Sequence, residues 1–314
     1  MKAVFLDRNT FLSSLTMPTP NGVSEYQVFE STPQDDDVIV ARCEGADIII
    51  VNKVVIGRVV IERLPNLKLI QLTATGMNNI DLVACEECGV AVQNVAGYST
   101  DSVPEHTFML MLTAMRAGRH YHTQATDGTW QADGKFCLLD TPILDLAGRT
   151  LGIVGRGAIG QKVGQIATAF GMTVLYADRA GATPREGYTA FDEVLACANV
   201  ISLHCPLTDD THHLINDDTI SKMGKKPLII NVARGDVVDS HAIVRGLLEG
   251  KILGYASDVF PQEPPTDDEP LLALKDHPRV FFTPHNAWGS ENAQSRLWAI
   301  LCQRVSGFIK DKSL

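Results

Sequence analysis

The sequence predicts an α/β protein of two parallel-sheet domains, with the second domain inserted into the first. Short β-rich runs alternate with helical segments along the 314 residues, a pattern typical of parallel sheets with right-handed crossovers. A glycine-rich motif at 151–160 starts a second series of such units, so a complete domain precedes it. The chain closes with a helical segment that no strand follows, and we expect this helix to pack back on the first domain.

The first domain is predicted from strands and helices that alternate over the first hundred residues. The expected strands are 2–6, 47–51, 67–72 and 90–92, and the expected helices are 34–43, 54–64 and 81–88. A long helix rich in Met and Leu is expected over 102–122, and a polar loop over 127–135 follows it.

Three glycines mark the start of the second domain. An apolar strand at 151–154 leads into Gly155, Gly157 and Gly160, which have the G-x-G-x-x-G spacing of a dinucleotide fingerprint. The first glycine permits a tight turn, the second lets the backbone approach a pyrophosphate, and the third lets the helix at 159–170 pack close to the strand. The N-terminus of that helix offers unpaired N–H groups to phosphates. The motif predicts a Rossmann-type domain.

An acidic residue follows the next strand, as the fingerprint requires. The strand at 173–176 is followed by Asp178, which is placed to accept hydrogen bonds from an adenosine ribose. Such a carboxylate favours NAD and repels a 2′-phosphate. The neighbouring Arg179 is of the residue type that can accept this phosphate, but we expect NAD.

The remaining elements continue the alternation to the end of the chain. The expected strands are 199–204, 228–232, 253–258 and 280–282, and the expected helices are 191–197 and 241–249. An amphipathic helix over 290–309 closes the chain.

Composition excludes several classes of partner. The net charge is −10, from 27 basic and 37 acidic residues, and no basic cluster is present, which disfavours nucleic acid and anionic membranes. The N-terminal apolar run breaks at Asp7 and Arg8, and the longest apolar stretch is too short to span a bilayer, so we expect a cytoplasmic protein.

Cys85 and Cys88 form a C-x-x-C without a second ligand pair nearby. We interpret them as reduced structural thiols and predict no metal site.

Polar residues that could carry chemistry follow three strands of the second domain. Arg234 comes after the strand at 228–232, Asp258 and Glu263 come at and after the end of 253–258, and His285 follows 280–282. In an open parallel sheet, ligands bind beyond the carboxyl ends of the strands, where all of these residues are expected.

This residue set fits hydride transfer to a 2-oxo acid. A nicotinamide can deliver hydride to the carbonyl carbon, and the oxygen then needs a proton, for which His285 is the candidate donor. Glu263 could hold the other ring nitrogen and stabilise the imidazolium. Arg234 supplies a planar fork that can bind the substrate carboxylate and polarise the adjacent carbonyl.

The chain resembles the D-isomer-specific 2-hydroxyacid dehydrogenases over essentially its whole length. The matching segments are LTATGMNNIDL (72–82), NVAGYSTDSVPEHT (94–107), the glycine fingerprint (155–160), HCPLTDDTHHLI (204–215), NVARGDVVD (231–239), DVFPQEPP (258–265) and TPHNAWGS (283–290). The resemblance implies a flavodoxin-like substrate-binding domain from 1–100 and 289–314, and an NAD-binding Rossmann domain at 101–288. It also implies a homodimer joined through the nucleotide domains, including the long helix.

The resemblance further implies roles for individual residues. Arg234, Glu263 and His285 are the implied catalytic set, and Thr75, Gly76 and Met77 present backbone N–H groups to the substrate carboxylate, together with Arg234 and His285. The implied cofactor contacts are Thr75, Gly155, Gly157, Ala158, Ile159, Gly160, Asp178, Cys205, Val232, Ala233, Arg234, Asp258 and His285.

Within this family the chain is most similar to the glycerate dehydrogenases, also called hydroxypyruvate reductases. LTATGMNNID, NVAGYSTDSVPEHT and FCLLDTPILDLAG carry this closer resemblance. It implies NADH-dependent reduction of hydroxypyruvate, and also of glyoxylate, to the 2-hydroxy acid. The alternatives are a D-3-phosphoglycerate or D-lactate dehydrogenase, or a dinucleotide-sensing binding protein like the corepressors that share this fold.

Overall fold

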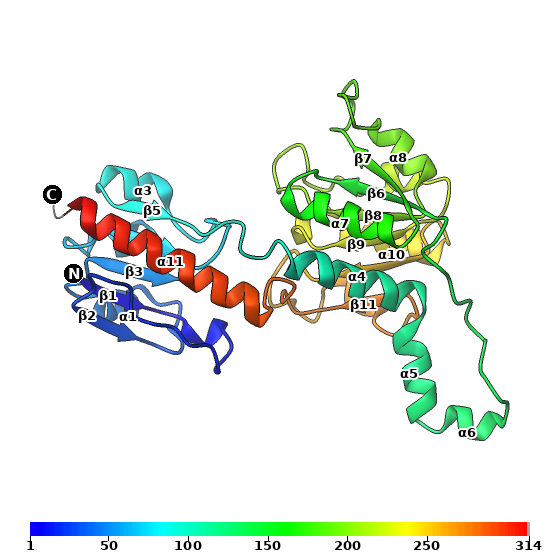
Figure 1. Cartoon of the computed structure of the whole chain (residues 1–314), viewed down its shortest axis with the longest axis horizontal. Helices are drawn as coiled ribbons and strands as arrows, with labels where there is room; N and C mark the ends of the chain where they lie inside the picture. The colour runs from blue at the N-terminus through cyan, green and yellow to red at the C-terminus, as the bar shows by residue number, and fades with distance from the viewer. Residues whose placement is uncertain (313–314) are drawn as a thin grey trace. The chain divides into compact units, whose positions relative to one another are not determined.

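The chain divides into two compact units, each built on a parallel sheet (Figure 1). Unit 1 comprises Met1–Ser99 and Gly289–Leu314, and unit 2 comprises Thr100–Trp288. The computed structural model describes residues 1–312, so the last two residues of the expected segment 289–314 lie outside the described part. The predicted fold class, two parallel-sheet α/β domains, is confirmed.

Unit 1 contains a five-stranded parallel sheet of strand order β2-β1-β3-β4-β5. This is the 2-1-3-4-5 order of flavodoxin-like sheets. Its strands are β1 (Lys2–Phe5), β2 (Glu25–Val28), β3 (Ile48–Val51), β4 (Leu69–Leu72) and β5 (Ala91–Gln93). Its helices are η1 (Arg8–Thr10), α1 (Asp36–Arg42), α2 (Arg58–Glu62), α3 (Leu82–Glu87) and α11 (Glu291–Lys312).

Both faces of the sheet of unit 1 are covered. Residues of α1, α2 and α3 form one apolar cluster with β1, β3 and β4. The C-terminal helix α11 supplies Trp298, which is 2% exposed and whose ring centroid lies 5.6 Å from that of Phe5 in β1. The last helix therefore packs on the first domain, as its sequence position predicts.

Unit 2 contains a six-stranded parallel sheet of order β11-β10-β9-β8-β6-β7. Its strands are β6 (Thr150–Val154), β7 (Thr173–Ala177), β8 (Val200–Leu203), β9 (Leu228–Asn231), β10 (Gly254–Ser257) and β11 (Val280–Phe282). Its helices are α4 (Ser102–Met115), α5 (Gly118–Thr126), α6 (Thr129–Asp133), α7 (Ala158–Ala169), α8 (Phe191–Cys197), α9 (Asp217–Ser221), η2 (Gly235–Val237), α10 (Ser240–Leu248) and η3 (Pro270–Leu274).

Successive residues of each central strand in unit 2 enter different cores. In β9, Leu228 and Ile230 lie in the cluster that includes α4 and α7, whereas Ile229 lies in the cluster with α8, α9 and α10. This period of two explains why the strands read as continuous apolar runs, since both faces are buried.

The strand order of unit 2 reverses at β6. The strand that follows β6 in sequence, β7, pairs with one edge of it, and the next strand, β8, pairs with its other edge. The gap between β6 and β8 is therefore the topological switch point, where ligands of such sheets bind.

The prediction of a single helix over 102–122 is wrong. The chain forms α4 and α5, separated at Ala117, whose φ of 50° is left-handed and ends the hydrogen-bonding pattern of α4. The adjoining Gly118 weakens helical continuity. The expected polar loop at 127–135 also contains the short helix α6.

The segment from 118 to 142, which we term the arm, extends away from the sheet of unit 2 (green in Figure 1). It includes α5 and α6. Within residues 1–312, none of the helices is both long and apolar enough to cross a membrane.

Candidate active site

The glycine-rich loop after β6 is shaped by close backbone contacts at the switch point. Gly155 has a φ of 100°, and a Cβ there would lie 2.6 Å from the carbonyl carbon of His204 and 2.7 Å from the backbone nitrogen of Cys205, after β8. A Cβ on Gly160 would overlap the carbonyl oxygen of Gly155. A Cβ on Gly157 would have no atom within 4 Å, so the backbone there faces open space.

Helix α7 begins at this open glycine. Gly157 is its N-cap, and the N–H of Gln161 bonds the carbonyl of Gly157 at 2.9 Å. The backbone N–H groups of Ala158 and Ile159 come before this bond and have no carbonyl within the helix. Unpaired N–H groups beside a side-chain-free surface fit the pyrophosphate of a dinucleotide.

The carboxylate of Asp178, expected to bind a ribose, is covered by an arginine from the loop after β7. Its side chain is 2% exposed, and Arg185 Nη2 lies 2.7 Å from Oδ1. Arg179 beside it contributes its backbone N–H to Oδ1 at 2.8 Å. Sequence reasoning singled out Arg179 but did not identify Arg185, which lies seven residues away in a polar loop.

Beyond β10 and β11, a histidine and a glutamate form a short contact. His285 Nδ1 lies 2.6 Å from Glu263 Oε2, with the two side chains 28% and 32% exposed. The other glutamate oxygen accepts the N–H of Phe260 at 3.1 Å, which orients the carboxylate. His285 has a left-handed φ of 50°, a conformation that few non-glycine residues adopt and that is enriched at functional sites.

Arg234 follows β9 in extended backbone and is held by its own loop. Its Nη1 donates to the carbonyl of Ala233 at 2.7 Å, and its carbonyl accepts from Asn231 Nδ2 at 2.8 Å. The next residue, Gly235, packs so closely that a Cβ would overlap the backbone of Phe260. The loop that carries Arg234 therefore lies directly against the loop that leads to Glu263.

Asp258 at the end of β10 fixes the loop that carries His285. Its carboxylate is buried, and Oδ1 accepts the N–H of Asn286 at 2.9 Å while Oδ2 accepts the N–H of Ala287 at 2.9 Å. Its carbonyl accepts the N–H of His285 at 2.8 Å. The contacts of the Asp258 carboxylate therefore support a positioning role, and its expected cofactor contact stays a prediction.

A histidine of α4 joins this network. His106 in α4 lies with Nε2 2.9 Å from Thr283 Oγ1, and this hydroxyl donates to Asp258 Oδ1 at 2.6 Å. Because the hydroxyl has one proton to give, His106 Nε2 must carry the hydrogen that it donates to Thr283. Burial lowers the pKa of His106, which favours this neutral form. Its place inside an expected helix gave no signal of this role.

The remaining expected site residues divide between the two units. Val232 and Ala233 lie in the loop after β9, so they share the carboxyl edge of the unit 2 sheet with Cys205 and His285. Thr75, Gly76 and Met77 lie in unit 1, in the turn that follows β4. Thr75 Oγ1 donates to the carbonyl of Val95 at 3.0 Å, which fixes that turn to the segment after β5.

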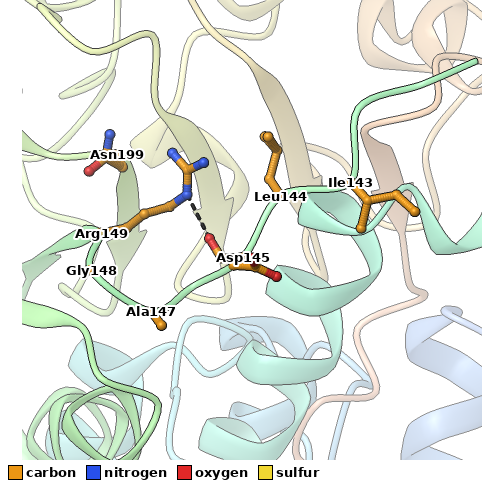
Figure 2. Close-up of a pocket in the computed structure, with 7 residues that line it drawn as sticks. All are labelled: Ile143, Leu144, Asp145, Ala147, Gly148, Arg149 and Asn199. Atoms are coloured by element: carbon orange, nitrogen blue, oxygen red, sulfur yellow. Dashed lines mark hydrogen bonds between the residues drawn. The ribbon is translucent and has the colours of Figure 1, made fainter. Parts of the chain in front are cut away.

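Figure 2 shows a hollow at the other edge of the sheet of unit 2. It has a volume of about 450 Å³ and is lined by Asp145, Arg149 and Asn199 among others. Arg149 Nε donates to the carbonyl of Asp145 at 2.6 Å (Figure 2). Asn199 Oδ1 accepts the N–H of Thr150 at 3.0 Å. These groups precede β6 and β8, so this hollow lies away from the carboxyl ends where such sheets bind ligands.

Two further clusters bear on the expected metal and thiol chemistry. His212, His213 and Asp236 place ligand atoms within 4.8 Å of one another, but the two rings stack with centroids 4.0 Å apart. Stacked rings direct their in-plane lone pairs side by side, and not at the common point that a tetrahedral metal needs. Cys85 is buried, which raises the pKa of its thiol to about 11 and fits a structural role.

Comparison with known proteins identifies relatives along the whole chain. Residues 108–287 match the family model described as "D-isomer specific 2-hydroxyacid dehydrogenase, NAD binding domain". A Haemophilus influenzae protein assigned to the 2-hydroxyacid dehydrogenases is 43% identical, over 99% of this chain and 98% of its own length. A glycerate dehydrogenase of Methylorubrum extorquens is 39% identical, over 99% of this chain and 97% of its own length. The solved structure of the D-lactate dehydrogenase of Aquifex aeolicus, complexed with NAD and lactic acid, has a TM-score of 0.79 and 30% sequence identity. The match covers 99% of this chain and 96% of that one.

Proposed function

The chain belongs to the D-isomer-specific 2-hydroxyacid dehydrogenase family, and we propose that it reduces hydroxypyruvate to D-glycerate with NADH. Its cofactor is NAD. The observation that carries the proposal is the 2.6 Å contact of His285 with Glu263, at the same sheet edge as the glycine-rich loop. A histidine held by a carboxylate through one ring nitrogen can act as an acid through the other.

The residues of unit 2 supply a proton and binding contacts for the reaction. When bound, NADH provides the hydride for the carbonyl carbon of the substrate. His285 donates its Nε2 proton to the carbonyl oxygen, and Glu263 stabilises the imidazolium through Nδ1 before and during this transfer. In glycerate oxidation the same nitrogen takes the proton from the C2 hydroxyl, because the reverse reaction uses the same groups.

Arg234 and the turn after β4 are the proposed binding groups for the substrate carboxylate. The contact of Arg234 Nη1 with Ala233 uses one edge of the guanidinium and leaves other N–H groups to bind a carboxylate. The backbone N–H groups of Thr75, Gly76 and Met77 are the second proposed contact.

Hydroxypyruvate is proposed over other 2-oxo acids because of the likeness to a glycerate dehydrogenase over nearly the full length of both chains. A D-lactate dehydrogenase is also similar in structure, at 30% identity. Discrimination between such acids depends on a few pocket contacts, each worth about 1–3 kcal/mol. D-lactate, D-3-phosphoglycerate and dinucleotide sensing without turnover are the alternatives.

We further propose that the chain forms a homodimer through unit 2. The arm exposes large apolar side chains, with Phe136 96% exposed and Leu139 72% exposed. Trp130 in α6 is 42% exposed. Apolar side chains that gather on one projecting segment are typical of a protein interface.

The product of the reaction tests the proposed function. Purified protein is incubated with NADH and hydroxypyruvate, and the glycerate formed is separated by chirality and quantified against the NADH consumed. The proposal predicts D-glycerate in a one-to-one ratio with oxidised NADH. Formation of L-glycerate, or NADH binding without consumption for any small 2-oxo acid, would contradict it, and the second result would favour the sensing alternative.

A further inference from the structure

The hollow at the amino edge of the unit 2 sheet contains an arginine with terminal nitrogens that bind no other group of the protein. Its volume of about 450 Å³ lies within the range of small-molecule sites, about 300–1,000 Å³. Arg149 is partly exposed, and among residues 1–312 no group accepts a hydrogen bond from its Nη1 or Nη2. Figure 2 shows these two nitrogens on the side of the guanidinium away from the contact between Nε and Asp145. The fork is therefore oriented by the protein and still has donors to offer.

An asparagine amide is fixed beside this arginine. Asn199 Oδ1 accepts the N–H of Thr150 at 3.0 Å, and the backbone N–H of Asn199 donates to the carbonyl of Thr150 at 2.9 Å. Thr150 directly follows Arg149, so these two bonds hold Asn199 against the segment that carries the guanidinium. Among residues 1–312, Nδ2 of Asn199 has no acceptor. The hollow therefore has a second fixed donor, from the start of a different strand.

The carboxylate nearest in sequence to this arginine is paired with another residue. Asp145 gives Arg149 only its backbone carbonyl, whereas its side chain is 80% exposed and lies 2.7 Å from Arg116 Nη1. Within residues 1–312, Arg149 forms no ion pair with a carboxylate. The positive charge at the hollow is therefore not neutralised by a contact with the protein.

A second guanidinium adds positive charge close to the hollow. Arg279 is 5% exposed, and its Nη1 donates to the carbonyls of Ala114 and Met115 at 2.9 and 3.0 Å. Burial lowers the pKa of Arg279, and the positive charge of Arg149 lowers it further. In the described part of the chain Arg279 forms no ion pair with a carboxylate either. Two neighbouring guanidinium groups that both lack a carboxylate partner attract an anion.

We propose that the hollow beside Arg149 and Asn199 is a second ligand site, which binds the carboxylate or phosphate group of a small molecule. The two terminal nitrogens of Arg149 match two oxygens of such a group, and Asn199 Nδ2 donates to the same group. The site lies before β6 and β8, at the edge of the sheet opposite the glycine-rich loop. It is therefore separate from the proposed dinucleotide and substrate sites, and the inference does not depend on the proposed substrate.

Isothermal titration calorimetry with inorganic phosphate and with butyrate tests the inference. All proteins carry Arg234→Gln and are saturated with NAD, so that neither the proposed substrate-binding arginine nor the glycine-rich loop contributes. Arg149→Gln, Arg149→Lys and Asn199→Asp are compared with this reference protein. Arg42→Gln is the matched control, because Arg42 is also partly exposed and also donates to a backbone carbonyl, that of Ser31 at 2.6 Å, but lies in unit 1. Circular dichroism verifies that each variant is folded.

The inference predicts that the reference protein binds at least one of the two anions at a single site. Arg149→Gln should weaken this binding at least about tenfold, because two charge-assisted hydrogen bonds are lost. Arg149→Lys should retain part of the affinity, since the charge remains but the fork does not. Asn199→Asp keeps the oxygen that accepts from Thr150 and replaces the donor with a negative charge, so it should also weaken binding at least about tenfold. Arg42→Gln should leave the affinity unchanged.

The two anions distinguish the possible ligands. Binding of phosphate alone would assign the site to a phosphate group, and binding of butyrate alone would assign it to a carboxylate attached to a short apolar chain. Two results would overturn the inference. One is a reference protein that binds neither anion with a dissociation constant below about 10 mM, a limit weaker than ordinary specific binding. The other is an Arg149→Gln variant that binds both anions as the reference protein does.

Discussion

At the scale of single residues, proton transfer depends on the short contact between His285 and Glu263. The left-handed backbone of His285 and the N–H of Phe260 on Glu263 fix the two side chains from opposite ends. The buried carboxylate of Asp258 fixes the segment that follows His285, because it accepts the N–H groups of Asn286 and Ala287. The ring is therefore oriented before any ligand binds, which is the arrangement that acid catalysis requires.

Replacement of His285 by Ala should lower kcat by about two to four orders of magnitude, the usual contribution of a positioned general acid. NADH affinity should fall far less than kcat, because the glycine-rich loop and α7, which carry most of the expected cofactor contacts, are unchanged. Steady-state kinetics and NADH fluorescence measure the two quantities. The exposed His241, at the start of α10, gives the matched control variant His241→Ala. Equal kcat values for His285→Ala and wild type would refute the acid role.

The sequence was sufficient to place Arg234, Glu263 and His285 at one edge of a sheet, because each follows a recognisable apolar strand. It was not sufficient to find His106, Thr283 or Arg185. Their roles depend on contacts between segments far apart in the chain, such as α4 with the end of β11. The pairing of Asp178 with Arg185 likewise depends on how the loop after β7 folds back.

At the scale of elements, the site depends on loops that are pressed together beyond β9, β10 and β11. Gly235 is the closest approach, since its Cα faces the backbone of Phe260 without room for a side chain. The loop after β9 then positions Arg234 against the segment that carries Glu263.

Gly235→Ala should therefore separate these two loops and reduce kcat/KM by at least about tenfold, because small displacements of binding groups reduce rates strongly. The control is Gly307→Ala in α11, where a Cβ would meet no atom within 4 Å. Kinetics with thermal unfolding of both variants separates a local effect from global destabilisation. Wild-type kcat/KM in Gly235→Ala would show that the two loops adjust independently.

The end of β8 carries a buried titratable group with a predictable effect on stability. Burial lowers the pKa of His204 to about 4, and its Nε2 lies 2.8 Å from Ser202 Oγ. An unfolded histidine titrates near ~6.5. As pH falls from that value towards 4, the unfolded chain binds a proton that the folded chain does not, so the free energy of unfolding decreases.

His204→Asn should remove this contribution. The free energy of unfolding, from urea titrations at a series of pH values, should decline less steeply below about pH 6.5 in the variant than in the wild type. His241→Asn, at an exposed position, should leave the slope as it is. A variant with the wild-type slope would mean that His204 is solvated and titrates normally in the folded state.

Element positions were largely predictable where apolar periodicity was strong. β11 and α8 match their expected bounds, and the other predicted strands differ by one or two residues at their ends. The edge strand β2 was missed because its sequence, EYQV, has no apolar face, and among residues 1–312 it pairs only with β1. The break at Ala117 was missed because alanine is the strongest helix former, whereas its backbone here is left-handed.

At the scale of the whole molecule, each unit has its own two-sided core, and the closing helix α11 completes the core of unit 1. The position of the glycine fingerprint in the chain predicted two sheets. The order of strands in each sheet cannot be read from periodicity, because crossover direction leaves no mark on the apolar pattern. For unit 1, the strand order was predicted by the resemblance, which implies a flavodoxin-like sheet.

The proposed homodimer is tested on the arm. The double variant Phe136→Asp with Leu139→Asp should sediment as a monomer where the wild type sediments as a dimer, because buried carboxylates at an interface are costly. The matched control is Leu248→Asp, which changes an exposed leucine at the end of α10. Sedimentation equilibrium gives both masses. A monomeric wild type, or a double variant that stays dimeric, would place the arm outside any interface.

The central claim is the substrate, and the most direct measurement is kcat/KM with NADH for hydroxypyruvate, glyoxylate, pyruvate and phosphohydroxypyruvate under one set of conditions. The account predicts that hydroxypyruvate exceeds each of the others by at least about tenfold, the ratio that a difference of about 1.4 kcal/mol in activation free energy gives. A higher value for pyruvate or phosphohydroxypyruvate would contradict the account and assign the chain to another substrate within the same family.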